Sequence, residues 1–159
     1  MPTINVAATV PINPPNTTPL THAQVWAGLR RKIRTPRDFV PVIKNCDIIS
    51  DENGLVCRRV DFEGGKTVME TCREYAPNRI HFTVDDGSEV QNVISLGQDG
   101  DLYLTYSFSW KLEGVVDGGE TFQEEEAKNQ NVSASSCGAA CVLIVWDVVD
   151  GYCGSDKEH

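Results

Sequence analysis

The sequence predicts an α+β protein in which two short helices follow the first strand and an antiparallel β-sheet forms the rest of the body. Residues 102–112 alternate strictly between large apolar side chains and smaller or polar ones, which is the period of a strand with one buried face. Turn sequences recur about every 8–12 residues from residue 46 onward, which is typical of an antiparallel meander. Because no helical pattern separates these segments, a parallel sheet of βαβ units is disfavoured.

Capping and turn residues mark the elements before the meander. Residues 4–10 are a first strand that ends at Pro11. Thr21 and Gln24 form a capping box, and an apolar stripe at helical spacing follows it, made of Trp26, Leu29 and Ile33. A second short helix begins at Thr35-Pro36, with proline at its first position and an inward side made of Phe39, Val42 and Ile43.

The meander contains six strand-like segments, at 46–49, 55–62, 66–75, 79–84, 89–96 and 102–112. The last one places six large groups on a single face: Leu102, Leu104, Tyr106, Phe108, Trp110 and Leu112. Burial of each is worth roughly 1.5–3 kcal/mol, so a slip of one residue is strongly disfavoured. Such a face either packs as plain core or forms the wall of a pocket for an apolar ligand.

Charge divides the chain into a nearly neutral body and an acidic tail. Residues 1–112 carry 12 Lys and Arg against 13 Asp and Glu, whereas residues 113–159 carry 2 against 10. We expect one domain over 1–112, an acidic flexible loop over 113–131 and an atypical apolar segment over 132–159. A net charge of −9 argues against nucleic-acid binding. The basic cluster is either a solvated helix end or an anion or partner contact: Arg30, Arg31, Lys32, Arg34 and Arg37.

Targeting and cofactor patterns are lacking. The first twenty residues have no signal-peptide pattern, and the longest apolar run, 139–146, is far short of the ~20 residues that span a bilayer. We therefore expect a cytoplasmic protein without a membrane span and with mostly buried, reduced thiols. The six cysteines and three histidines have no metal-ligand spacing, and we expect neither a metal nor another cofactor.

Three stretches of the body, 27–34, 39–43 and 101–110, resemble the SRPBCC superfamily of START and birch-pollen-allergen-like proteins, in a branch found in fungi and bacteria. The resemblance covers about residues 4–112. It implies a helix-grip fold, in which a curved antiparallel sheet and a long C-terminal helix enclose a cavity for hydrophobic ligands or, in some relatives, for cyclisation chemistry. No catalytic residue carries over from this branch.

The end of the chain departs from the family pattern. Beyond Trp110 an atypical segment stands in place of the long closing helix. We expect residues 139–149 to lie across the sheet as a substitute lid, or to pair two chains as a homodimer, because the apolar face would otherwise be incompletely covered.

A few polar side chains share the predicted inner face. Asn92 lies on the face of Val90 and Ile94, where its amide must find a partner in the backbone, in water or in a ligand. Tyr106 could orient a ligand through its hydroxyl, and Glu70 is either solvent-exposed or a buried acid–base group. The catalytic candidates are Glu70, Asn92 and Tyr106, and the ligand-binding candidates are Trp26, Phe39, Asn92, Leu104, Tyr106, Phe108 and Trp110.

Three functions fit these observations. The leading hypothesis is that the protein binds a small hydrophobic or amphipathic molecule against the 102–112 face. The alternative is a cyclase, pericyclase or dehydratase acting on a polyketide- or terpenoid-like substrate. A third is an interaction or stress-type domain with a vestigial pocket. An inner face filled solid by side chains would contradict the first.

Overall fold

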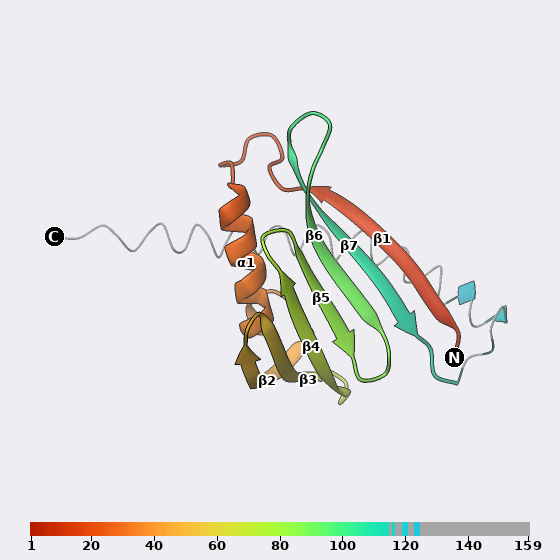
Figure 1. The fold of residues 1–159 in the computed structure, drawn as a ribbon. Helices are drawn as coiled ribbons and strands as arrows, with labels where there is room; N and C mark the ends of the chain where they lie inside the picture. Colours follow the sequence, from red (N-terminus) through yellow and green to blue (C-terminus); the bar gives the residue numbers. More distant parts are fainter. Residues whose placement is uncertain (115, 117–118, 121–122, 125–159) are drawn as a thin grey trace.

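A computed structural model describes residues 1–114, 116, 119–120 and 123–124. Within them a single antiparallel sheet of seven strands has the order β1-β7-β6-β5-β4-β3-β2 (Figure 1). The strands are β1 (Thr3–Pro11), β2 (Ile43–Glu52), β3 (Leu55–Phe62), β4 (Thr67–Tyr75), β5 (Arg79–Val84), β6 (Glu89–Leu96) and β7 (Leu102–Lys111). Consecutive strands from β2 to β7 are hydrogen-bonded neighbours, and β1 joins the meander beside β7.

The predicted strands are confirmed, three of them with the expected bounds: β3, β5 and β6. The predicted strand at 46–49 is longer than expected, because β2 pairs with β3 from Ile43 to Glu52 through two register irregularities. The register of β7 places Leu104, Tyr106 and Phe108 on the buried face, as its alternation predicts.

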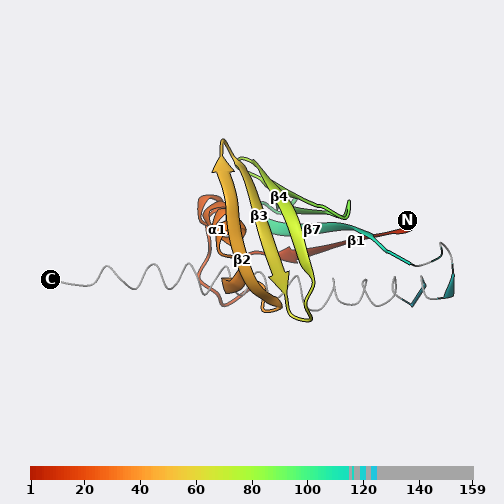
Figure 2. The same cartoon turned by 90° about the horizontal axis from the view of Figure 1, so that it is seen from below.

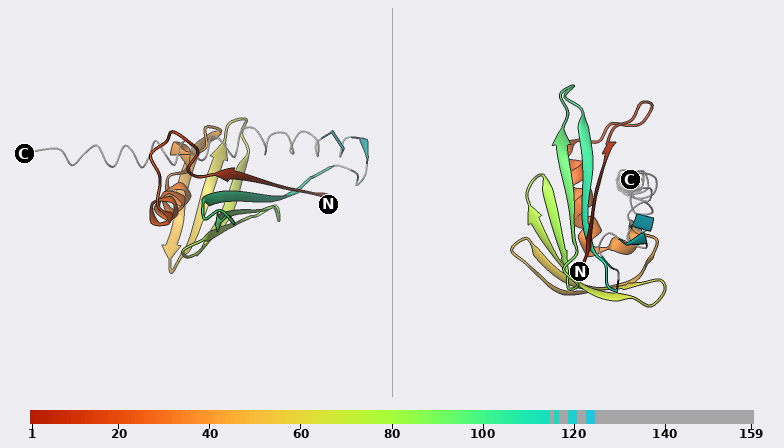
Figure 3. Two further views of the ribbon diagram at one scale, coloured as in Figure 1. Left: turned by 90° about the horizontal axis from the view of Figure 1, so that it is seen from above. Right: turned by 90° about the vertical axis from the view of Figure 1, so that its right-hand side faces the viewer.

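The sheet is strongly curved, and helix α1 (His22–Arg34) packs against it (Figures 2 and 3). The capping box is confirmed: Thr21 Oγ1 accepts from the Gln24 amide, and Gln24 Oε1 accepts from the Thr21 amide at 2.8 Å. The buried stripe of α1 joins inner-face residues of the sheet in one apolar core, to which α1 contributes Val25, Leu29 and Ile33. Trp26, predicted on that stripe, is only partly buried beside the core.

The second predicted helix is a single 3₁₀ turn, η1 (Pro36–Asp38). Phe39, which follows it, is 1% exposed and belongs to the core. The expected inward position of Val42 is wrong, because the chain leaves η1 for β2 there and the Val42 side chain is exposed. Ile43 is buried, as the first residue of β2.

The predictions for 113–131 and 132–159 fall almost entirely outside the described residues, and so does the lid or dimer contact expected at 139–149. Among the residues that the structure describes, no helix is both long enough and apolar enough to cross a membrane.

Candidate functional site

A cavity of about 510 Å³ lies on the inner face of the sheet, between the strands, the C-terminal part of α1 and the segment from Phe39 to Ile43. Its wall is mostly apolar and includes the aromatic side chains of Phe39, Phe82, Tyr106, Phe108 and Trp110. The ring centroids of Phe108 and Trp110 are 4.6 Å apart, and those of Tyr106 and Phe108 are 6.4 Å apart, in near-parallel stacks. Side chains of the described residues therefore do not fill the inner face solidly.

Strand register brings the residues of this wall together. Val90 pairs with Phe108 and Asn92 pairs with Tyr106 across β6 and β7. On the other side of β6, Val90 pairs with Phe82 of β5. Because alternate residues of a strand share a face, these pairings place aromatic rings from two strands beside the amide of Asn92.

Asn92 is the most unusual polar residue of the cavity. It is 1% exposed, and neither its Nδ2 nor its Oδ1 has a hydrogen-bond partner among the described residues. A buried polar atom without a partner costs about 1–3 kcal/mol relative to its solvated state. The sequence left two roles open for Asn92: a hydrogen bond to neighbouring backbone or water, or a contact with a ligand. The structure shows no hydrogen bond between Asn92 and the described backbone.

A buried ion pair, Arg58 with Glu70, forms the opposite wall. Both Nε and Nη2 of Arg58 donate to Glu70 Oε2, at 2.8 and 2.6 Å, across the β3–β4 pair. Arg58 Nη1 donates to the carbonyl oxygens of Lys32 (3.3 Å) and Ile33 (2.5 Å) at the end of α1. Arg58 is 4% exposed, and the Glu70 side chain is 13% exposed. The alternative of a solvent-exposed Glu70 is therefore wrong.

The Arg58–Glu70 pair links the cavity to the helix. Arg58 satisfies carbonyl groups that have no partner within the last turn of a helix, and its positive charge is favoured there. Oε1 of Glu70 takes no part in the hydrogen bonds of the described residues, all of which use Oε2. Glu70 thus binds Arg58, which in turn binds the end of α1, and Glu70 also lines the cavity.

Lys32 also lines the cavity. It is 9% exposed, and its Nζ lies 5.3 Å from the centre of the Tyr106 ring, over its face. A cation over an aromatic ring is stabilised by the ring quadrupole, more so when desolvated. For Lys32, the interpretation of the basic cluster as a solvated face is wrong.

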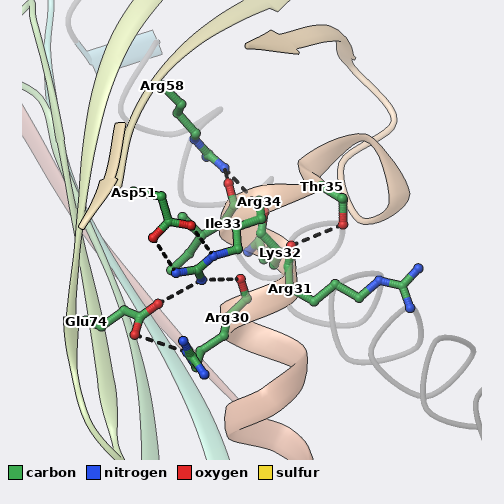
Figure 4. A network of polar contacts seen from close by, with 9 residues as sticks. All are labelled: Arg30, Arg31, Lys32, Ile33, Arg34, Thr35, Asp51, Arg58 and Glu74. Atoms are coloured by element: carbon green, nitrogen blue, oxygen red, sulfur yellow. Dashed lines mark hydrogen bonds and ion pairs between the residues drawn. The ribbon is translucent and has the colours of Figure 1, made fainter. Parts of the chain in front are cut away.

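Two arginines of the basic cluster, Arg30 and Arg34, bind acidic side chains of the sheet (Figure 4). Arg34 binds both oxygens of Asp51, at 2.7 and 2.9 Å, and Glu74 Oε1 at 2.8 Å. Arg30 binds Glu74 Oε2 at 3.1 Å. The hydrogen bond from Arg34 holds the pKa of the Asp51 carboxyl below its ordinary value of 3.8. Arg30 and Arg34 therefore fasten α1 to β2 and β4.

Six of the eight candidate residues line the cavity, and two do not. The cavity brings together Phe39, Glu70, Asn92, Tyr106, Phe108 and Trp110. Trp26 and Leu104 are not part of its wall, and Leu104 is 1% exposed in the core that includes the buried stripe of α1.

Sequence reasoning missed Arg58, Lys32 and Phe82 in this wall. A signal for Arg58 exists: it occupies the inward position between Val56 and Val60 of β3, and both of these valines are buried. A charge at such a position needs a partner of opposite sign, which Glu70 supplies from the next strand.

Three cysteines of the described residues, Cys46, Cys57 and Cys72, are free thiols. Burial raises the pKa of the Cys72 thiol to about 12. Within the described part of the chain, no group of three or more His, Cys, Asp or Glu side chains is arranged to hold a metal ion.

Comparison with known proteins identifies the family. The family described as acetylaranotin biosynthesis cluster protein L, AtaL, matches residues 6–143. The chain belongs to the AtaL family. No curated protein sequence is significantly similar to this AtaL-family chain.

Solved structures show that the AtaL-family chain has a helix-grip fold of the SRPBCC type, as the resemblance implies. It is similar to the di-domain ARO/CYC StfQ from the steffimycin biosynthetic pathway, with a TM-score of 0.69 and 7% identity over 96% of this chain. It spans about half of StfQ, covering 52% of that chain. It is similar to the Zhui aromatase/cyclase from Streptomyces (TM-score 0.61, 17% identity, 99% of each chain). It is also similar to Ara h 8.0201 (TM-score 0.58, 14% identity), covering 94% of this chain and 99% of that one.

Proposed function

We propose that this protein binds a small, mainly apolar or amphipathic molecule in the cavity on the inner face of the sheet. The observation that carries this proposal is the stacked aromatic wall of Tyr106, Phe108 and Trp110 around an open volume of about 510 Å³. Ligand pockets in proteins are typically about 300–1,000 Å³, with apolar walls and a few polar groups that fix orientation. The family, named for a biosynthesis cluster, and the aromatase/cyclase neighbours support a natural-product-like ligand.

Filling the cavity tests this proposal. Val90 lines the cavity between Phe82 and Phe108, and Val93 lies on the opposite face of the same strand. Val90→Phe adds a ring to the cavity, whereas Val93→Phe adds the same ring outside it. Titration with N-phenyl-1-naphthylamine, a neutral fluorescent probe, should give saturable binding that Val90→Phe weakens about tenfold or more and Val93→Phe leaves unchanged.

Thermal unfolding of both variants controls for loss of structure. Equal probe binding by wild type and Val90→Phe, with Val90→Phe folded, would contradict binding in this cavity. Absence of saturable binding to the wild type would contradict the proposal for apolar ligands of this size.

A second candidate function is catalysis, as a cyclase, pericyclase or dehydratase on a polyketide- or terpenoid-like substrate. The specific observation in its favour is Glu70, a largely buried carboxylate in the cavity wall whose Oε1 is not used by Arg58. A carboxylate in such a position can accept a proton from a bound substrate, while Asn92 or Tyr106 polarises a carbonyl group.

The catalytic candidate is tested with the products of synthases encoded beside this protein. Conversion of such a product that falls in Glu70→Gln, Asn92→Leu or Tyr106→Phe, with probe binding retained, would support catalysis. Unchanged turnover in all three variants would remove these residues from the mechanism.

A further inference from the structure

The amide of Asn92 points to the chemical class of the ligand. Its two polar atoms, Nδ2 and Oδ1, are both buried and both without a hydrogen-bond partner among the described residues. An unmet donor and an unmet acceptor in one side chain are costly together, because each has given up its water. A ligand that satisfies only one of the two would leave the other unmet.

The neighbouring residues of the sheet and the buried Arg58 give Asn92 no hydrogen bond. The register partners of Asn92 are Ile80 on β5 and Tyr106 on β7. All three donor nitrogens of Arg58 that face inward bind Glu70 or the carbonyl groups at the end of α1. A ligand with both a donor and an acceptor would supply the partners that Asn92 lacks among the described residues.

We propose that Asn92 recognises a cyclic cis-amide, or lactam, carried on an aromatic or aliphatic ring system. This inference rests on the proposed binding function and narrows its ligand. In a cis-amide the N–H donor and the carbonyl acceptor lie side by side in one plane. The primary amide of Asn92 presents the complementary acceptor and donor in the same way, so the two groups form a pair of parallel hydrogen bonds.

Ketones, ethers, carboxylates and open-chain amides fit less well. A ketone or an ether offers only acceptors and leaves Oδ1 unmet, and so does a carboxylate, which is ionised near neutral pH. An open-chain trans amide directs its donor and acceptor to opposite sides. The Asn92 amide is closed off from solvent, so the ligand reaches it only when a side chain that borders the cavity shifts.

The test compares two probes that differ by one methyl group: 6(5H)-phenanthridinone, a tricyclic lactam, and its N-methyl derivative, which lacks the donor. Wild-type protein should bind the lactam about tenfold or more tightly, because the N-methyl probe leaves Asn92 Oδ1 without a donor in a buried site. Asn92→Leu should remove that preference. Gln91→Leu, which changes the adjacent amide on the outer face of β6, should keep it.

The outcomes separate this inference from the proposed function. Equal affinity of the wild type for the two probes overturns the lactam inference, and so does a preference that survives in Asn92→Leu. Binding of N-phenyl-1-naphthylamine without binding of the lactam overturns the inference but keeps the cavity as a binding site. Failure to bind any of the three probes overturns the proposed function itself. The wild-type comparison decides the matter even where Asn92→Leu does not fold.

Discussion

Removal of the Arg58 side chain tests how the helix is held on the sheet. Arg58→Met leaves Glu70 as an uncompensated, largely buried carboxylate and removes the donor to the carbonyl groups of Lys32 and Ile33. Loss of one partner of a buried ion pair costs about 3–5 kcal/mol, and we expect a loss of that size in the free energy of unfolding. For a domain of this length, that corresponds to a fall in Tm of roughly 6–20 °C.

The neighbouring residue is a matched control. Arg59 lies on the same strand with its side chain 49% exposed, and it pairs with Asp47 at 3.3 Å. Because exposed ion pairs contribute about 0–1 kcal/mol, Arg59→Met should cost less than about 1 kcal/mol. Urea unfolding followed by circular dichroism measures both variants, provided that the slope with urea concentration stays constant.

The double variant Arg58→Met/Glu70→Gln separates the charge from the helix contacts. Its loss of unfolding free energy should be smaller than the sum of the losses of the two single variants, by about 0.5–3 kcal/mol, because no uncompensated Glu70 carboxylate is left buried. The loss of unfolding free energy that remains in the double variant measures the cost of leaving the carbonyl groups of Lys32 and Ile33 without their donor. The reasoning is refuted if Arg58→Met is no more destabilising than Arg59→Met, or if the two single losses simply add.

Three further predictions concern the rest of the fold. Arg34 lowers the pKa of the Asp51 carboxyl, so at acid pH the unfolded chain binds a proton at Asp51 more readily than the folded chain does. The stability that the ionised Asp51 contributes is therefore lost as the pH falls below about 3.8. Asp51→Asn should make the urea midpoint less sensitive to acid between about pH 5 and about pH 3. Burial raises the pKa of Cys72 to about 12, so iodoacetamide at about pH 8 should leave this thiol unmodified until urea unfolds the protein, as peptide mass spectrometry would show. Thr21→Ala removes the acceptor for the Gln24 amide and should lower the free energy of unfolding by about 0.5–2 kcal/mol, measured by urea unfolding.

The elements of the sheet were predictable because local signals determine them. Strict alternation defines β7, turn residues separate the strands, and the capping box starts α1 where Thr21 and Gln24 place it. The prediction for Val42 was wrong because it assumed a helix that continues past residue 42, whereas η1 ends after one turn. The sequence does not show where the chain leaves η1 for β2.

The site was only partly predictable because it depends on contacts between distant residues. Alternation places Asn92, Tyr106 and Phe108 on the inner face, but does not say which part of that face α1 covers. Leu104 shares the face of Tyr106 and yet lies in the core rather than in the cavity wall. The partner of Glu70 depends on the β3–β4 register, which sets Arg58 directly opposite it.

The position of Glu70 affects how any loss of function should be interpreted. Its Oε2 holds Arg58, and Arg58 in turn holds the end of α1, which borders the cavity. A Glu70 variant therefore changes the shape of the cavity as well as its chemistry, and a loss of activity alone does not identify a catalytic group. Asn92 has no hydrogen bond to another described residue, so its replacement by leucine removes the proposed ligand contact without breaking a structural hydrogen bond. Asn92→Leu should even raise the free energy of unfolding, because the buried amide loses its unmet donor and acceptor. A variant that gains stability while it loses the preference for a lactam would separate recognition from folding in this cavity.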